Sequence, residues 1–178
     1  VYTLLDDIVK YMPSPENREI AGINLKTNEI YEANYDFAKA KSAYIFKTIV
    51  DPYIGKYSLI KVCSGVIKTD DQLYNKDKDI DEKIGKLYVL QGNKPIEVPE
   101  LHAGDIGALA KLTAARTGNS LSTKATPIQF AKADISVPYT YMRYKVKNKG
   151  EIDKAAQSLQ KMTHEDQTLK VVNDTEKG

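Results

Sequence analysis

Between positions 38 and 126 the sequence is a series of short apolar segments, spaced roughly ten residues apart and separated by turns that contain glycine or proline. In the segment 44–50, Tyr44 and Phe46 alternate with Ile45 and Lys47, which is the period of two expected for a half-buried strand. Many short strands with regularly spaced turns are typical of small barrels. We therefore predict a mainly β fold class with a β-barrel over residues 38–126.

The same pattern predicts the other strands of this barrel. We expect strands at 57–63, 84–90, 96–98 and 106–112, with turns at 51–56, 91–95 and 117–120. One stretch departs from the pattern, because residues 75–83 (NKDKDIDEK) alternate in charge sign and are almost wholly polar. We predict a solvated loop there.

The N-terminal residues predict one amphipathic helix followed by a connector. A single apolar stripe with helical spacing contains Leu4, Leu5, Ile8, Val9 and Met12. Pro13 and Pro15 end the helix, because proline lacks the backbone donor that a helix interior needs. One helix cannot form a domain, so we expect its stripe to pack on another part of the protein. Residues 16–37 are polar and irregular and predict a connector with one or two short strands.

After position 126 the pattern changes to that of a small α+β unit. The segment 138–149 predicts a strand with Arg143, Lys145 and Lys147 on one face. A helical apolar stripe runs from Ile152 to Met162, and 168–172 predicts a further strand. A unit of this size is too small to be stable alone.

Composition excludes several classes of function. The chain has 178 residues and a formal net charge of +2, which argues against a globally basic nucleic-acid binder but leaves room for a local basic face. No apolar run approaches the ~20 residues of a membrane-spanning helix. The single cysteine, Cys63, cannot form an internal disulfide, and its place in a strand predicts a small buried apolar role.

No motif predicts a catalytic, metal or nucleotide site within these residues. His102 and His164 are the only histidines, and neither has a cysteine or carboxylate at zinc-ligand spacing. Gly55-Lys56 and Gly85-Lys86 lack the upstream glycine and the following hydroxyl of a phosphate-binding loop. We expect no cofactor in this chain.

The basic residues of the second long strand leave two interpretations open. Lys56 and Lys61 lie near Tyr53 and Tyr57, and a small barrel that presents lysine and tyrosine can contact a phosphate backbone. The same residues are also compatible with solvated lysines over a tyrosine-capped core, and composition alone favours this second interpretation.

Six stretches resemble one family in order and spacing. Residues 46–56 (FKTIVDPYIGK) and 62–65 (VCSG) are similar to domain II of bacterial elongation factor G. Residues 4–15 resemble the last helix of that family's GTPase domain, 100–106 and 117–121 its later barrel strands, and 157–162 the first helix of its domain III.

The resemblance implies a domain organisation. Residues 1–15 would end the GTPase domain, 16–37 would be the connector, 38–126 domain II, and 127–178 a truncated domain III. In the family, domain III is ferredoxin-like, with its third strand between the first and the second. Because Gly178 precedes that strand, we hypothesise an incomplete sheet with exposed edges that invite pairing with another chain.

The resemblance also implies a function. The parent would be a translational GTPase that drives tRNA and mRNA movement on the ribosome, with its GTP and Mg²⁺ held by motifs before Val1. This chain would be a non-catalytic, cytoplasmic fragment whose domain II docks on small-subunit rRNA through Lys56, Tyr57 and Lys61 and relays the GTP state. The full-length protein would be monomeric, with no membrane or DNA partner.

Two alternatives stay open on the sequence alone. The chain could derive from a ribosomal protection or rescue GTPase of the same architecture. It could also be a free-standing β-barrel interaction module with no GTPase attached.

Overall fold

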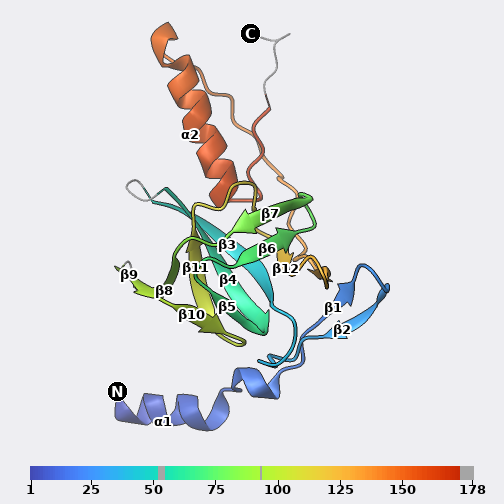
Figure 1. Ribbon diagram of the computed structural model, residues 1–178. Helices are drawn as coiled ribbons and strands as arrows, with labels where there is room; N and C mark the ends of the chain where they lie inside the picture. The colour runs from blue at the N-terminus through green and yellow to red at the C-terminus, as the bar shows by residue number, and fades with distance from the viewer. Residues whose placement is uncertain (52–54, 93, 173–178) are drawn as a thin grey trace.

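The computed structural model describes residues 1–51, 55–92 and 94–172 (Figure 1). Its helices are α1 (Tyr2–Tyr11), η1 (Pro15–Asn17), η2 (Lys149–Glu151) and α2 (Ile152–Glu165). The strands are β1 (Ala21–Asn24), β2 (Glu29–Glu32), β3 (Ser42–Asp51), β4 (Gly55–Ser64), β5 (Val66–Lys68), β6 (Gln72–Asn75), β7 (Ile80–Lys83), β8 (Leu87–Gln91), β9 (Lys94–Val98), β10 (Glu100–His102), β11 (Ile106–Ala110), β12 (Ser120–Ser122) and β13 (Ile128–Phe130). The predicted turns at 51–56 and 91–95 lie partly outside the described residues. Tyr53 lies outside them as well.

The main sheet has eight antiparallel strands in the order β7-β6-β12-β3-β4-β11-β8-β9, and β5 pairs with β10 beside it. β3 and β4 are the longest strands, with ten residues each. Side chains from both sheets share one buried core, which includes Ile45, Ile60, Val62, Ile67, Leu73, Leu101 and Leu109. The mainly β fold class, with a barrel in this part of the chain, is therefore confirmed. Where the chain divides into domains stays a prediction.

The predicted connector contains β1 and β2, which confirms the expected short strands. They form a separate sheet with β13 in the order β13-β1-β2. A Cβ on Gly22 would lie 2.8 Å from the Gln129 carbonyl oxygen, so this close strand approach requires glycine. Cys63 lies in the buried cluster between this sheet and the barrel, together with Phe130. Burial raises the pKa of the Cys63 thiol to about 12, so the predicted buried role is confirmed.

The predicted solvated loop at 75–83 is wrong, because β6 and β7 form a hairpin there. Glu82 is only 1% exposed, and its carboxylate accepts hydrogen bonds of 2.7–2.8 Å from the backbone N–H groups of Thr113, Ala114 and Ala115. The alternating charges suggest a solvated loop because the buried residue of β7 is a carboxylate, Glu82, and not an apolar side chain. The predicted strand at 84–90 also begins later than expected, at Leu87.

α1 confirms the predicted N-terminal helix, which ends at Tyr11 before the first proline. Its apolar stripe is exposed, with Leu4 at 63% and Ile8 at 43%, and no residue of α1 is buried among the described residues. The stripe therefore lacks the packing partner that the sequence leads us to expect. Neither this helix nor α2 has the length and apolarity needed to cross a membrane.

The two strands predicted after position 126 are wrong, although the helix between them, α2, is confirmed. Within the described residues, 131–148 and 168–172 form no strand. Tyr139 and Tyr141 are each 96% exposed. Alternating side chains do not make a strand unless a neighbouring strand pairs with the backbone, and this segment has none.

The C-terminal end of α2 lies at the end of the barrel, next to β3 (Figure 1). Glu165 accepts a hydrogen bond of 2.7 Å from the backbone N–H of Val50 in β3. Just beyond the helix, the Gln167 amide donates to the Thr117 carbonyl at 2.6 Å. These bonds fix the helix end against the barrel even though α2 buries no side chain among the described residues.

His164 adds a titratable contact to this junction. Its Nε2 lies 2.6 Å from Nη1 of Arg116. Partial burial is the main cause that lowers the pKa of His164, and the charges of Arg116 and Lys56 lower it further. A guanidinium can only donate, so a neutral His164 accepts the hydrogen bond from Arg116.

Candidate nucleic-acid interface

β4 carries the three residues that the sequence singles out, Lys56, Tyr57 and Lys61. Side chains of a strand alternate between its two faces. Lys56 therefore lies on one face of β4, while Tyr57 and Lys61 lie on the other. The structure does not bring the two lysines together.

Lys56 is engaged within the protein. Its ammonium donates a hydrogen bond of 2.9 Å to the carbonyl oxygen of Ala115. Partial burial is the main cause that lowers the pKa of Lys56, the charge of Arg116 lowers it further, and the carboxylate of Glu82 acts in the opposite direction. This lysine helps to hold the 113–116 loop at the end of the barrel.

Tyr57 is buried, with 5% of its surface exposed. Its ring meets that of Tyr88 edge to face, with 5.7 Å between the ring centroids. Ala108 and Ala110 of β11 complete the cluster around it. This arrangement packs β4, β8 and β11 together on the outer face of the sheet. Tyr57 therefore has a structural role in the packing of these strands.

Lys61 is half-exposed, and its ammonium lies 5.0 Å from the centroid of the Tyr35 ring. This is within the range of a cation–π contact. Tyr35 has a left-handed backbone with φ 54°, and its N–H donates to the Cys63 carbonyl of β4 at 3.0 Å. The ring is therefore held in place beside the strand that carries Lys61.

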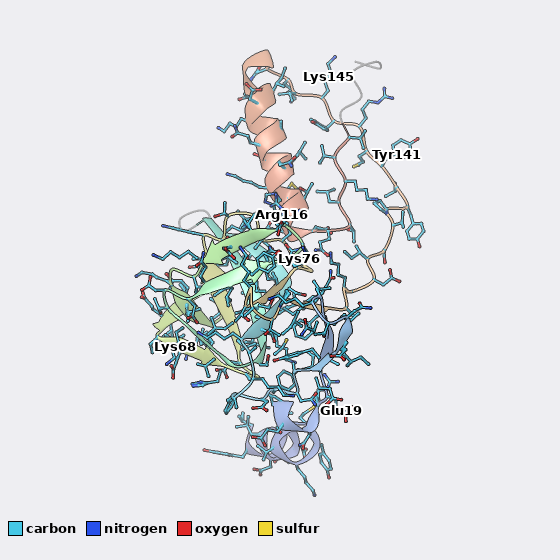
Figure 2. All side chains as sticks on the ribbon, turned by 45° about the vertical axis from the view of Figure 1, so that its right-hand side comes forward. Glu19, Lys68, Lys76, Arg116, Tyr141 and Lys145 are labelled. Carbon is cyan, nitrogen blue, oxygen red and sulfur yellow. The ribbon has the colours of Figure 1, made fainter. Side chains whose placement is uncertain are left out.

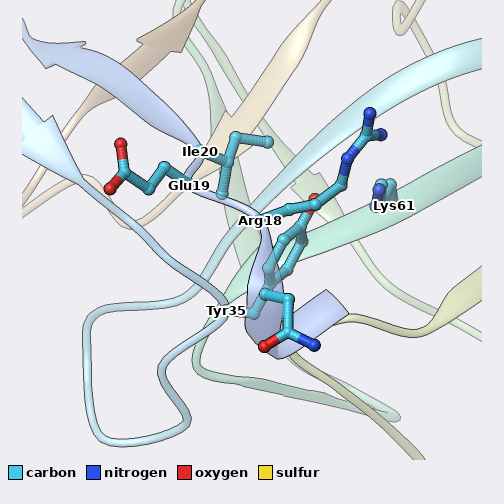
Figure 3. A pocket seen from close by; sticks show the side chains of 6 residues that line it. Arg18, Glu19, Ile20, Tyr35 and Lys61 are labelled. Atoms are coloured by element: carbon cyan, nitrogen blue, oxygen red, sulfur yellow. The ribbon is translucent and has the colours of Figure 1, made fainter. Parts of the chain in front are cut away.

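A hollow of about 630 Å³ opens beside Lys61. Its lining consists of Asn17, Arg18, Glu19, Ile20, Tyr35 and Lys61. Figure 3 shows the Arg18 and Lys61 side chains reaching the same side of the hollow, while the Glu19 carboxylate points the other way. We call these six residues the Arg18–Lys61 hollow.

Arg18 is the residue of this hollow that sequence reasoning missed. It lies in the predicted connector, far from Lys61 along the chain, and no local motif marks it. The two cations reach one hollow because Ile20, which follows Arg18 and Glu19, packs against the core cluster that contains Ile60 of β4. Among the described residues, neither Arg18 nor Lys61 forms an ion pair with a carboxylate.

The other basic segment lies elsewhere. Figure 2 shows Lys145 and Tyr141 at the α2 end of the molecule and Glu19 near the α1 end. Lys145 therefore lies far from the Arg18–Lys61 hollow, and the lining of that hollow includes neither Arg143 nor Lys147.

The two histidines also lie apart, in different contacts. Nε2 of His102 lies 3.2 Å from Glu100 and its Nδ1 lies 3.7 Å from Asp105, whereas His164 meets Arg116. In the part of the chain that the structure describes, no group of three or more histidine, cysteine or carboxylate side chains is placed to hold a metal ion.

Comparisons with known proteins agree on one family. Residues 40–124 match the family model described as elongation factor G domain 2. The whole chain is 35% identical to elongation factor G of Chlamydia caviae and, equally, to that of Chlamydia trachomatis, and it covers 26% of each. It thus spans about a quarter of the length of the curated relatives it matches.

A solved structure shares the fold. The crystal structure of ttk003000868 from Thermus thermophilus matches 98% of this chain with a TM-score of 0.74 and 24% identity, over 24% of that chain. At this identity the likeness is one of fold, and it supports the barrel with its flanking segments.

Proposed function

Because this chain belongs to the elongation factor G family and its residues 40–124 are the domain 2 of that family, we propose that it docks a translational GTPase on the small ribosomal subunit. The barrel binds small-subunit rRNA and relays the GTP state to the other domains while tRNA and mRNA move. The chain itself is non-catalytic. GTP and Mg²⁺ belong to another domain of the parent.

The identity over the whole chain supports this proposal over a free-standing barrel, because the relatives match α1 and α2 as well as the domain 2 segment. The exposed stripe of α1 then packs on the GTPase domain. The proposed setting is the cytoplasm, with the ribosome as partner and a monomeric full-length protein. A membrane and DNA are not among the proposed partners.

The observation that carries the proposal is the state of Lys61. Its ammonium is half-exposed, lies over Tyr35 and is free of carboxylate partners among the described residues. Lys56 and Tyr57 also belong to the proposed rRNA-binding residues, but we expect them to act in other ways than Lys61. Lys56 reaches a phosphate only when its bond to Ala115 opens, and Tyr57 acts by packing β4.

Co-sedimentation of this chain with purified small ribosomal subunits tests the proposal. We expect Lys61→Glu to weaken binding roughly tenfold, because it removes a charge-assisted contact and adds repulsion. Lys78→Glu is the matched control, since Lys78 is an exposed lysine in the β6–β7 turn. Equal binding of the two variants would refute the role of Lys61, and no binding by the unmodified chain would refute the docking itself.

Lys56→Glu separates contact from packing. The reversal places a second carboxylate near Glu82, so we expect a loss of thermal stability in the free chain. If binding falls no further than the folded fraction does, Lys56 acts within the protein. A binding loss beyond the unfolded fraction would instead support a direct phosphate contact.

A further inference from the structure

We propose that Arg18 and Lys61 form a two-cation clamp that holds one backbone phosphate group of the RNA partner. The inference rests on the proposed function and adds to it a residue outside the barrel. It predicts that a connector side chain, which the barrel alone does not supply, contributes to binding.

The backbone on both sides of the clamp is fixed by hydrogen bonds. The N–H of Ile20, two residues after Arg18, donates to Oδ1 of Asn34 at 3.0 Å. The Ile20 carbonyl in turn accepts from Ala33 N–H at 2.9 Å. Lys61 extends from the middle of β4, which pairs with β3 and β11. Two cationic side chains on fixed backbone segments lose less conformational entropy when they bind a ligand than two cationic side chains on mobile segments do.

The charges of the hollow are unbalanced on one side. Some surface cations have carboxylate partners, such as Lys41, whose ammonium lies 2.6 Å from Asp71. Arg18 and Lys61 line one hollow and form no ion pair with a carboxylate of the described residues, and Glu19 points away (Figure 3). Two like charges in one hollow repel each other, and an anion bound between them relieves that repulsion.

The chemistry of the two groups fits a phosphodiester. A guanidinium presents a planar fork that binds two oxygens of one phosphate, and an ammonium adds a point charge from another direction. The Asn17 amide in the lining supplies a further donor. The hollow is wide and open, which suits a phosphate on a polymer backbone better than a small molecule that needs enclosure.

Filter binding of this chain to purified small-subunit rRNA over a range of salt concentrations tests the clamp. We expect Arg18→Ala to weaken binding about tenfold and to reduce the slope of log affinity against log salt by about 1. Arg18→Lys should retain most of the slope, because it keeps the charge. Arg143→Ala is the matched control, since Arg143 is an exposed arginine on another surface.

The outcomes separate the clamp from the proposed function. If Lys61→Ala weakens binding while Arg18→Ala equals the Arg143→Ala control, the clamp is wrong and the docking stands. If the unmodified chain binds neither the rRNA nor small subunits, both are wrong. If polyglutamate competes as well as RNA of equal charge, the hollow is an acidic-peptide site and the clamp is overturned.

Discussion

The barrel and the segment 131–148 carry similar side-chain patterns but have opposite fates. β3 alternates apolar and polar residues and is paired on both sides, with β4 and β12. In the segment 131–148, Arg143, Lys145 and Lys147 alternate with less polar residues such as Met142 and Val146. The segment nevertheless forms no strand in the described structure and exposes Tyr141 almost completely. The comparison teaches that alternating side chains can define the two faces of a strand, but that a strand forms only where a neighbouring strand pairs with its backbone hydrogen-bonding groups.

The largest expected effect is a core truncation in the barrel. Ile60 is fully buried in the core, so Ile60→Ala should lower the free energy of unfolding by about 3 kcal/mol through lost burial and the cavity left behind. Tyr141→Ala, on an exposed side chain, should change it by less than about 0.5 kcal/mol. Urea unfolding measures both, and similar losses would show that the segment 131–148 is packed as the barrel is.

A smaller loss is expected from the buried carboxylate of β7. Glu82→Ala leaves the N–H groups of Thr113, Ala114 and Ala115 without their acceptor. We expect a loss of about 2 kcal/mol. Glu29→Ala, an exposed carboxylate on β2, is the control for urea unfolding. A loss no greater than the control's would mean that water replaces the carboxylate at no cost.

The smallest effect concerns pH and the junction between α2 and the barrel. The folded-state pKa of His164 is lowered from its ordinary value of 6.5. Contact between α2 and the barrel is therefore favoured at pH values above 6.5. This preference is lost progressively as the pH falls through 6.5 toward the lower folded-state pKa. We expect the backbone N–H of Val50, which bonds to Glu165, to exchange faster at pH 5.5 than the intrinsic pH effect predicts.

A neutral replacement provides the control for this pH effect. His164→Gln retains a hydrogen-bond acceptor for Arg116 without titrating, so it should remove the excess exchange of the Val50 amide at low pH. Hydrogen exchange followed by NMR measures the amide directly. The same excess in the variant would assign the pH effect to another group.

The sequence predicts most of the barrel strands, because short apolar segments between turns mark where they lie. It does not predict every buried face, since a register shift in β3 between Ile45 and Lys47 leaves Phe46 41% exposed while Ile45 is fully buried. It does not predict Glu82, since a buried carboxylate looks like a solvated one until the 113–115 loop brings three N–H donors to it. Charge sign alone therefore places β7 in a loop.

The candidate site was half predictable. Lys61 stands out as a basic residue on a barrel strand next to tyrosines. Arg18 does not, because its place beside Lys61 depends on Ile20 packing against the core cluster that contains Ile60 of β4. Tyr57 is a residue type that suits an RNA contact, but its neighbours Tyr88 and Ala108 bury it.

Chemical footprinting of rRNA on purified small subunits tests the central claim most directly. Our account predicts that this chain protects a discrete set of small-subunit nucleotides, and that Lys61→Glu loses this protection while Lys78→Glu keeps it. Protection that is absent with the unmodified chain, or that survives unchanged in Lys61→Glu, would contradict docking through the face of β4 that carries Lys61.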